Sequence, residues 1–234
     1  MTHITTIGLD ADDTLWHNER HFQFTQGRFA EMLADHAPPD VLARKLLAAE
    51  TKNLHFYGFG IKGFTLSMIE TAIEVTNGKI SPAAIKRILD AGREMLHHPV
   101  ELLPQVRETL EALAPDYRLV LITKGDLFDQ ERKLAQSGLG ELFTAIEIVS
   151  DKTAATYATA FTKYGDGPDR ALMAGNSLKS DVLPAIAAGA IGVHIPHELT
   201  WAHEHAEAPR DHPKFREIAS LKEIPGLLIA SLPN

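Results

Sequence analysis

The sequence predicts an α/β protein, with a doubly wound parallel sheet and a helical block inserted after the first strand. Short apolar runs alternate with helical patterns after Pro99, which is typical of strand–helix–strand units in a parallel sheet. Another apolar run, Ile4–Leu9, stands far upstream, near the N-terminus. Between Glu19 and about His98 the pattern is helical and nearly free of strand signals.

Four helices are predicted in the inserted block. Apolar positions from Phe22 to Leu33 mark the first helix and those from Val41 to Leu47 the second, with Pro38-Pro39 between them. Phe64–Val75 marks the third helix. The fourth begins at Ser81-Pro82, which combines a capping residue with the proline favoured at the first helical position.

The rest of the chain supplies the other predicted strands and their connecting helices. The strands are Arg118–Thr123, Ala145–Val149, Arg170–Gly175 and Ile191–Ile195, and the helices are Val106–Leu113, Asp126–Gln136, Thr153–Lys163 and Ser180–Ala188. Ile218–Ile229 is expected to form a short strand and a final helix. We therefore expect a core domain of residues 1–16 and 99–234 and an inserted helical domain of residues 17–98.

The composition of the chain excludes several classes of function. The 234-residue chain has a formal net charge of −8 with histidine neutral, which argues against a broad basic face for nucleic acid. It has no cysteine, which excludes disulfides, thiolate catalysis and cysteine-bound zinc. We see no apolar run of about 18 residues and no signal-peptide pattern. We expect a cytoplasmic monomer or homodimer whose partner is a small molecule, not a nucleic acid or a membrane.

Three carboxylates, Asp10, Asp12 and Asp13, follow the first predicted strand within four residues. Clustered acids at the end of a buried strand repel one another and lose solvation, a cost that a bound cation removes. Ligands bind at the carboxyl ends of strands in open α/β sheets. The cluster therefore predicts a Mg²⁺ and phosphate site, although an acidic turn or a helix cap explains this stretch alone equally well. Asp13 is expected to shape the local turn.

Polar residues also follow three other predicted strands. They are Thr123-Lys124-Gly125, Asp151-Lys152 and the stretch from Asn176 to Asp181. Because the carboxyl ends of parallel strands lie along one edge of the sheet, these residues should gather beside Asp10 and Asp12. Each segment alone has an ordinary structural explanation, and the specific signal is the order of all four.

These segments resemble the four motifs of the haloacid dehalogenase (HAD) superfamily, and the match runs along the whole chain. Asp10-x-Asp12-x-Thr14 is similar to the first motif, Thr123 to the second, Lys152 to the third, and Gly175-Asn176-Ser177-x-x-x-Asp181 to the fourth. The helical block resembles the family's type-one cap. The resemblance implies a Mg²⁺-dependent phosphatase that hydrolyses a small phosphorylated metabolite through an aspartyl-phosphate intermediate.

The resemblance also implies a catalytic role for four residues. Asp10 is the expected nucleophile, because transfer to a carboxylate divides hydrolysis into two easier steps. Asp12 is the expected general acid for the leaving oxygen and then the base for the attacking water. Thr123 is expected to donate a hydrogen bond to the phosphoryl group, and Lys152 to neutralise it.

Mg²⁺ would be held by the Asp10 carboxylate, the Asp12 carbonyl and a side chain of the fourth motif, Asn176 or Asp181. One departure from the family concerns this set. The first polar position of the fourth motif is usually acidic, and here it is Asn176. An uncharged amide should lower the affinity for the metal, and Asp181 would then carry a larger share of it.

Further substrate contacts are expected from the backbone N–H groups of Lys124 and Gly125 and from the side chain of Lys62. Lys62 lies in Phe56–Phe64, a stretch rich in glycine and aromatic residues between the second and third helices. This stretch is either a substrate-specificity loop, with Lys62 reaching an anion, or a plain turn with core aromatics.

Other functions on the same fold stay open. A phosphomutase would use the same core, and a 2-haloacid dehalogenase would need the nucleophile but no acid for a leaving oxygen. A non-catalytic phospholigand-binding protein is a third alternative, against which the intact set Asp10, Asp12, Thr123 and Lys152 argues. The histidine-rich stretch Thr200–Phe215 matches no usual metal-ligand spacing and is expected to be a solvated loop.

Overall fold

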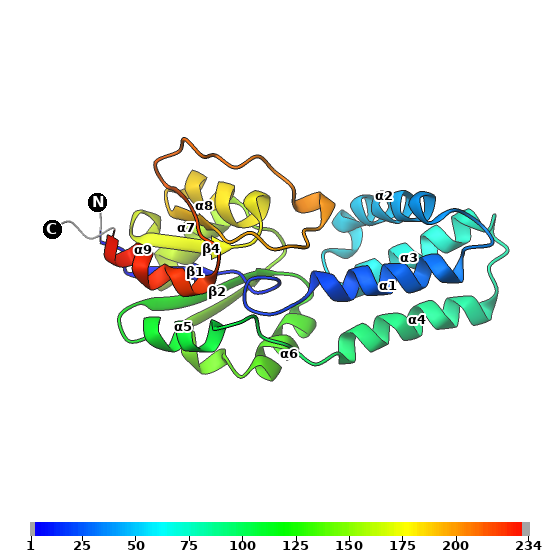
Figure 1. Cartoon of the computed structure of the whole chain (residues 1–234), viewed down its shortest axis with the longest axis horizontal. Coiled ribbons are helices and arrows are strands. Elements are labelled where there is room, and N and C mark those ends of the chain that lie inside the picture. Colours follow the sequence, from blue (N-terminus) through cyan, green and yellow to red (C-terminus); the bar gives the residue numbers. More distant parts are fainter. Residues whose placement is uncertain (1–2, 231–234) are drawn as a thin grey trace. The chain divides into compact units, whose positions relative to one another are not determined.

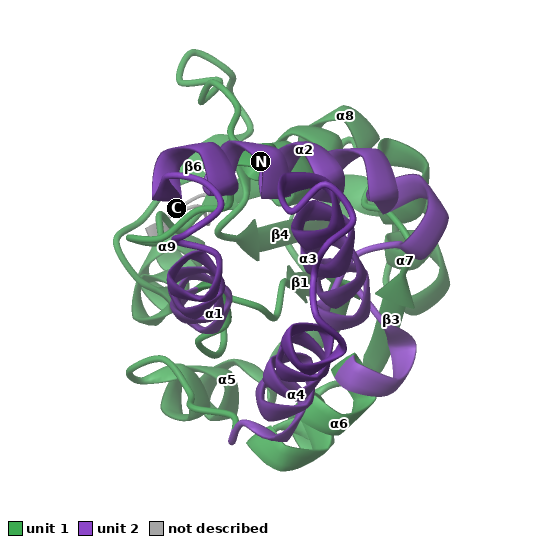
Figure 2. Cartoon of the chain, turned by 90° about the vertical axis from the view of Figure 1, so that its right-hand side faces the viewer, with its two compact units in different colours: residues 1–19, 100–124, 130–234 green, residues 20–99, 125–129 purple. Residues whose placement is uncertain are grey.

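The structure is a computed structural model and describes residues 3–230. Contacts within the chain divide it into two compact units, coloured separately in Figure 2. The sheet unit comprises the chain up to residue 19, residues 100–124 and the chain from residue 130 on. The helical unit comprises residues 20–99 and the short segment 125–129. Each unit has its own cluster of buried apolar side chains.

The sheet unit contains a six-stranded parallel sheet in the order β3-β2-β1-β4-β5-β6. The strands are β1 (Thr6–Leu9), β2 (Arg118–Lys124), β3 (Ala145–Val149), β4 (Ala171–Gly175), β5 (Ile191–His194) and β6 (Phe215–Glu217). The predicted parallel α/β sheet is confirmed, and β1 to β5 lie close to their predicted positions. The C-terminal strand is different: it precedes the predicted range 218–229, because the buried Phe215 pairs with Gly192 of β5.

Helices cover both faces of the sheet (Figure 1). They are α5 (Val106–Leu113), α6 (Leu127–Ser137), α7 (Ala154–Tyr164), α8 (Leu183–Ala188) and α9 (Ile224–Ala230). Side chains of α5, α6 and α9 pack with Ile7 and Leu9 of β1, whereas side chains of α7 and α8 pack with Val120 and Ile122 of β2. Because successive residues of a strand point to opposite faces, this arrangement buries the sheet on both sides.

The helix predicted from Ser180 begins differently from a regular α-helix. Leu178–Val182 is a π-helical turn, and α8 starts only at Leu183. Pro184 has no N–H to donate to the carbonyl of Ser180, so the regular hydrogen-bond pattern cannot extend back through this turn. The Ser180 carbonyl instead accepts a hydrogen bond from the Tyr157 hydroxyl of α7 at 2.9 Å.

The helical unit contains the four predicted helices, α1 (Glu19–Met32), α2 (Pro39–Tyr57), α3 (Ile61–Val75) and α4 (Pro82–His97). The predicted cap of α4 is confirmed, since the Ser81 hydroxyl accepts from the Ala84 N–H at 3.1 Å. The predicted stretch Phe56–Phe64 is mostly helical: only residues 58–60 connect α2 to α3. Gly58 and Gly60 have φ of 69° and 113°, a conformation that glycine adopts without strain.

The sheet order places β1 between β2 and β4. All the strands are parallel, so Asp10, Thr123 and Gly175 lie together at the carboxyl edge of this central group. Across residues 3–230, no helix combines the length and the apolar content that crossing a bilayer requires.

Candidate active site

The turn after β1 brings two carboxylates to the edge of the sheet. It is closed by the Leu15 N–H, which donates to the Ala11 carbonyl at 2.8 Å. Asp13 has a φ of 61°, which Asp tolerates better than most residues. Its buried carboxylate accepts from the N–H groups of Asn18 and Glu19, both at 2.9 Å. The expected role of Asp13 in the local turn is confirmed.

Asp10 is buried at the end of β1, and both of its carboxylate oxygens accept hydrogen bonds. Lys152 donates to Oδ1 at 2.5 Å and the Thr14 hydroxyl donates to Oδ2 at 2.9 Å. The same ammonium group lies 2.7 Å from Oδ1 of Asp181. Lys152 follows β3 and Asp181 follows β4, so one buried lysine links residues from three strand ends.

Negative charge exceeds positive charge at this lysine. Burial raises the pKa of Asp10, the Asp181 carboxylate raises it further, and Lys152 offsets only part, which leaves it at about 7. Burial alone would lower the pKa of Lys152, but Asp10 and Asp181 together raise it above its ordinary value. Additional positive charge beside Asp10 would bring the pKa of Asp10 back toward its ordinary range.

Asp12 is held from three sides. The Trp16 indole donates to Oδ1 at 2.7 Å, and Lys133 lies 2.8 and 3.0 Å from the two carboxylate oxygens. Gln130 donates to Oδ2 at 3.2 Å. Gln130 and Lys133 lie three residues apart on α6, so they share one helix face. These contacts fix the position of the Asp12 side chain at the edge of the sheet.

Thr123 is buried near the end of β2, and its hydroxyl oxygen accepts from Gln130 at 2.6 Å. Because the oxygen accepts this bond, the hydroxyl hydrogen can be donated to a phosphoryl oxygen. Gln130 bonds both Thr123 and Asp12 and therefore holds the two side chains in a constant relation to each other.

The side chain of Asn176 lies against the turn that follows β1. Its carboxamide faces the Asp12 carbonyl and Oδ2 of Asp10, and with the nitrogen turned toward them it donates to both at 3.2 Å. The backbone N–H of Asn176 donates to the Thr14 hydroxyl at 3.0 Å. The structure thus brings together three of the four residues predicted to hold Mg²⁺.

These three groups fit a magnesium ion. The Asp12 carbonyl and Oδ2 of Asp10 face the end of this carboxamide, a place that favours an electropositive group, and the carboxamide can present its oxygen there. One carboxylate and two neutral oxygens, completed by water, are a suitable donor set for Mg²⁺. No three His, Asp or Glu side chains within residues 3–230 are arranged around a metal position, so the fit depends on the Asp12 carbonyl and the Asn176 amide.

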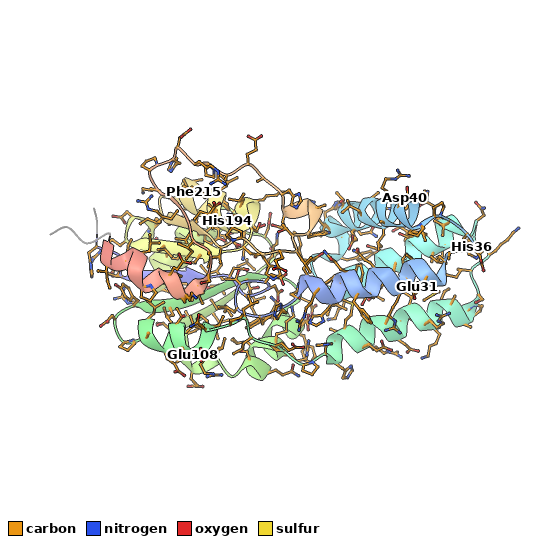
Figure 3. All side chains as sticks on the ribbon, in the orientation of Figure 1. Glu31, His36, Asp40, Glu108, His194 and Phe215 are labelled. Carbon is orange, nitrogen blue, oxygen red and sulfur yellow. The ribbon has the colours of Figure 1, made fainter. Side chains whose placement is uncertain are left out.

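His194 supports the loop of Asn176 from the end of β5. Its Nε2 lies 3.2 Å from the Asn176 carbonyl, and its Nδ1 lies 3.1 Å from the Glu217 carboxylate of β6. Figure 3 labels His194 and, on the neighbouring strand, Phe215. The last two strands therefore help to position the predicted metal loop.

Asp181 is buried and has both carboxylate oxygens engaged. Oδ1 faces Lys152, and Oδ2 accepts from the Ser177 N–H at 2.9 Å. A Cβ atom on Gly175 would lie 2.2 Å from Oδ2, so this approach requires glycine. In this arrangement Asp181 positions Lys152. The role of Asp181 as a metal ligand stays a prediction.

Two of the lysines predicted to contact substrate are paired with carboxylates. The ammonium of Lys62 is 2.9 Å from both carboxylate oxygens of Asp126, and both residues belong to the helical unit, as does Gly125. The ammonium of Lys124 is paired with Glu204 and lies 2.7 Å from the Ser180 hydroxyl. The substrate contacts of these residues stay predictions.

The stretch Thr200–Phe215, expected to be a solvated loop, carries an acid into the site. Glu204 is paired with Lys124, and its other carboxylate oxygen accepts from the hydroxyls of Ser177 and Ser180. Burial alone would raise the pKa of Glu204, but Lys124 and the two hydroxyls outweigh burial and lower it to about 2. The expectation was wrong for this residue, because its charge finds partners on two strand ends.

The sequence interpretation missed four residues of this site: Trp16, Gln130, Lys133 and Glu204. A signal existed for two of them. Gln130 and Lys133 are spaced for one helix face in the helix predicted directly after the second motif. Glu204 has no such signal, because only the folding of a long loop between β5 and β6 brings it to the other residues.

The comparison with protein families agrees with this geometry. A family model described as "Hydrolase: haloacid dehalogenase-like hydrolase" matches residues 4–189. The matched range contains the residues at the ends of β1 to β4 that form the group around Asp10.

Individual proteins are similar over nearly their whole length. The glyceraldehyde 3-phosphate phosphatase of Methanothermobacter thermautotrophicus is 24% identical over 242 residues, covering 94% of this chain and 99% of that protein. A solved haloacid dehalogenase-like family hydrolase from Xanthomonas campestris is 43% identical with a TM-score of 0.86, covering 97% of this chain and 91% of that chain. The HAD-hydrolase YfnB from Bacillus subtilis, solved bound to magnesium, is 16% identical with a TM-score of 0.67 over 97% and 99% of the two chains, a likeness of fold alone.

Proposed function

The chain belongs to the haloacid dehalogenase-like hydrolases, and on this basis we propose that it hydrolyses phosphate monoesters through a phosphoryl group held covalently on Asp10. The observation that carries the proposal is the buried ammonium of Lys152 between the carboxylates of Asp10 and Asp181, with Asp12 and Thr123 at the same edge. Charged side chains are costly to bury, and such a cluster is typical of a functional site.

The proposed reaction has two steps. In the first, a carboxylate oxygen of Asp10 forms a bond to phosphorus, the ester P–O bond breaks, and Asp12 gives a proton to the leaving oxygen. In the second, water attacks phosphorus, Asp12 takes a proton from this water, and the Asp10–phosphorus bond breaks. The products are an alcohol and inorganic phosphate, and both side chains return to their initial states.

Two further side chains stabilise charge on the phosphoryl group. Lys152 supplies a fixed positive charge that burial strengthens, since it interacts through a medium of low dielectric. Thr123 supplies a hydroxyl hydrogen whose direction is set by the bond from Gln130. Both groups are in place before substrate arrives, so little reorganisation is needed during the reaction.

We propose Mg²⁺ as the cofactor, held by the Asp10 carboxylate, the Asp12 carbonyl and the Asn176 carboxamide. When bound, the ion would supply the positive charge that neutralises the phosphoryl oxygens. The Asn176 side chain would present its oxygen to the ion, while its backbone stays fixed by Thr14 and His194. Asp181 would act by positioning Lys152.

We propose that the helical unit serves as a cap that selects a small phosphorylated metabolite. The chain passes between the two units at residues 19–20, 99–100, 124–125 and 129–130, and two of these crossings directly follow the site segments at β1 and β2. The named activity of the Methanothermobacter relative makes triose phosphates the first substrates to assay.

Replacement of Asp10 by Asn tests the proposal. The amide is nearly isosteric but is not a competent nucleophile, so Asp10→Asn should lower phosphate release by roughly three orders of magnitude or more. The assay measures inorganic phosphate from an aryl phosphate and from triose phosphates, with and without Mg²⁺. In the wild-type protein, acid quenching and mass spectrometry should find the phosphoryl group on the peptide that contains Asp10.

Asp40→Asn is the matched control, since Asp40 is an exposed acid at the start of α2. It should retain full activity. Normal turnover by a folded Asp10→Asn protein would refute the covalent mechanism. Release of halide from 2-haloacids without any phosphatase activity would instead identify a dehalogenase.

A further inference from the structure

Three lysines that reach the ends of β1, β2 and β4 are each already paired with a carboxylate. The pairs are Lys152 with Asp10 and Asp181, Lys133 with Asp12, and Lys124 with Glu204. Asp13 adds another buried carboxylate. The protein side chains at this edge therefore carry more negative than positive charge, and a second anionic group on a substrate would meet no surplus of cations among them.

Glu204 is built into this edge although it comes from a distant loop. Its carboxylate binds the ammonium of Lys124 and the hydroxyls of Ser177 and Ser180, and its side chain is only 11% exposed. Because this carboxylate has a pKa of about 2, it is ionised at neutral pH and cancels the charge of Lys124.

The paired lysine lies next to the reacting group. Lys124 directly follows Thr123, and its ammonium also contacts Ser180, the neighbour of Asp181. Since β1 lies between β2 and β4, a link from Lys124 to Ser180 spans the end of β1, where Asp10 is located. An unpaired ammonium at this place would attract any negative group that a substrate carries near its phosphate.

We propose that Glu204 determines specificity: by neutralising Lys124 it makes the site prefer phosphate esters of neutral alcohols over esters whose leaving group carries a carboxylate. The inference rests on the proposed phosphatase function. Every phosphate ester carries about two negative charges on its phosphoryl group, so charge can distinguish substrates only through their leaving group. Glu204 then acts against the wrong substrate by cancelling the charge that would attract it, and discrimination against a competitor is a common route to specificity.

Glycerol 3-phosphate and 3-phosphoglycerate test this inference, because they share a three-carbon skeleton and differ by a carboxylate in place of a hydroxymethyl group. The measured quantity is the ratio of kcat/KM for 3-phosphoglycerate to that for glycerol 3-phosphate. Glu204→Gln keeps the size of the side chain and removes its charge. It should raise the ratio by roughly tenfold, as expected for one unit charge acting at short range in a partly buried site.

Three further variants separate charge at this position from other effects. Glu207→Gln makes the same chemical change at an exposed position of the same loop and should leave the ratio unchanged. Lys124→Gln keeps Glu204 and removes its partner, so the ratio should fall below that of the wild-type protein. The double variant Glu204→Gln with Lys124→Gln should return the ratio to near the wild-type value.

The outcomes distinguish this inference from the proposed function. If the wild-type protein hydrolyses no phosphate ester, the proposed function fails. If it does, and Glu204→Gln lowers kcat/KM equally for both esters, Glu204 is structural and the inference is wrong. An equal rise of the ratio in Glu204→Gln and Glu207→Gln would show an effect of net charge alone, which also refutes it. Lys124→Gln provides an independent answer if Glu204→Gln does not fold.

Discussion

Asp10 shows how a buried carboxylate can be suited to reaction and costly to the fold. It is 6% exposed and shares one lysine with Asp181. Removing a single partner from such a group leaves a buried charge uncompensated, which is more damaging than replacing the charge itself. A neutral substitution of Asp10 should therefore raise stability and lower activity.

In metal-free protein, Asp10→Asn should stabilise the fold at pH 8 by on the order of 2 kcal/mol and much less at pH 5. The pKa of Asp10 is raised from 3.8 to about 7 in the folded state. At pH values between these two, Asp10 has lost its proton in the unfolded chain but keeps it in the folded chain. The free energy of unfolding of the wild-type protein therefore falls as pH rises, and the loss is complete above pH 7. Denaturant unfolding of both proteins in chelator at the two pH values measures this. A difference that does not vary with pH would contradict it.

Asn176→Asp should tighten the binding of Mg²⁺ in the absence of substrate. The Asn176 carboxamide faces Oδ2 of Asp10 and the Asp12 carbonyl, so a carboxylate there would add negative charge to the same oxygens. In the native protein, Mg²⁺ and phosphate should bind with positive coupling, since each supplies charge that the other lacks. Calorimetric titration with Mg²⁺, and Mg²⁺ dependence of turnover, compare the two proteins. Equal affinities would place residue 176 outside the metal shell and favour Asp181 as the ligand.

At the scale of elements, the site depends on how β4 ends. Its last residue, Gly175, permits Asp181 to return from the π-helical turn Leu178–Val182 and approach the strand closely. Ser177 directly precedes this turn, and its N–H donates to the Asp181 carboxylate. The end of β4, the turn that follows it and the absence of a side chain at Gly175 together place the Asp181 carboxylate against Lys152.

Gly175→Ala should reduce turnover severely, by roughly two orders of magnitude or more, through loss of the geometry around Lys152. The new Cβ would lie 2.2 Å from Oδ2 and 2.8 Å from Cβ of Asp181, so the whole side chain must move. Gly140→Ala is the matched control, since a Cβ there meets no atom within 4 Å. The measurement is kcat together with thermal stability. A Gly175→Ala protein with normal kcat would show that the position of Asp181 does not matter for turnover.

At the scale of the whole molecule, the helical unit takes in residues 125–129, which directly follow the site segment at the end of β2. Lys62 at the start of α3 is paired with Asp126 in this segment, and Asp126 also accepts from the Asp129 N–H in the first turn of α6. The pair is partly exposed, and such pairs contribute roughly 0 to 1 kcal/mol to stability. Its effect on folding should therefore be small.

If Lys62 binds substrate, Lys62→Ala should raise KM several-fold with little change in kcat, since it removes binding and not chemistry. Asp126→Asn is the comparison variant: it removes the same ion pair, keeps an oxygen for the Asp129 N–H, and leaves Lys62 charged. It should leave KM unchanged or lower it. Equal effects of the two variants would mean that Lys62 acts only through the pair with Asp126.

Local sequence patterns were enough to predict the architecture and the group of residues around Asp10. Apolar runs alternating with helical patterns predict the parallel sheet, because period and length are properties of adjacent residues. In a parallel sheet the carboxyl ends share an edge, so Asp10, Thr123, Lys152 and Asp181 could be placed together without coordinates.

Only the tertiary structure decided which partners these residues have. Glu204 reaches Lys124 because the loop between β5 and β6 folds back over the sheet edge, and no local pattern encodes that path. Gln130 and Lys133 converge on Asp12 for a similar reason, since their approach depends on how α6 packs on the sheet. The sequence by itself determined which strand ends carry the reacting groups, whereas long-range packing decided how the charge of each group is balanced.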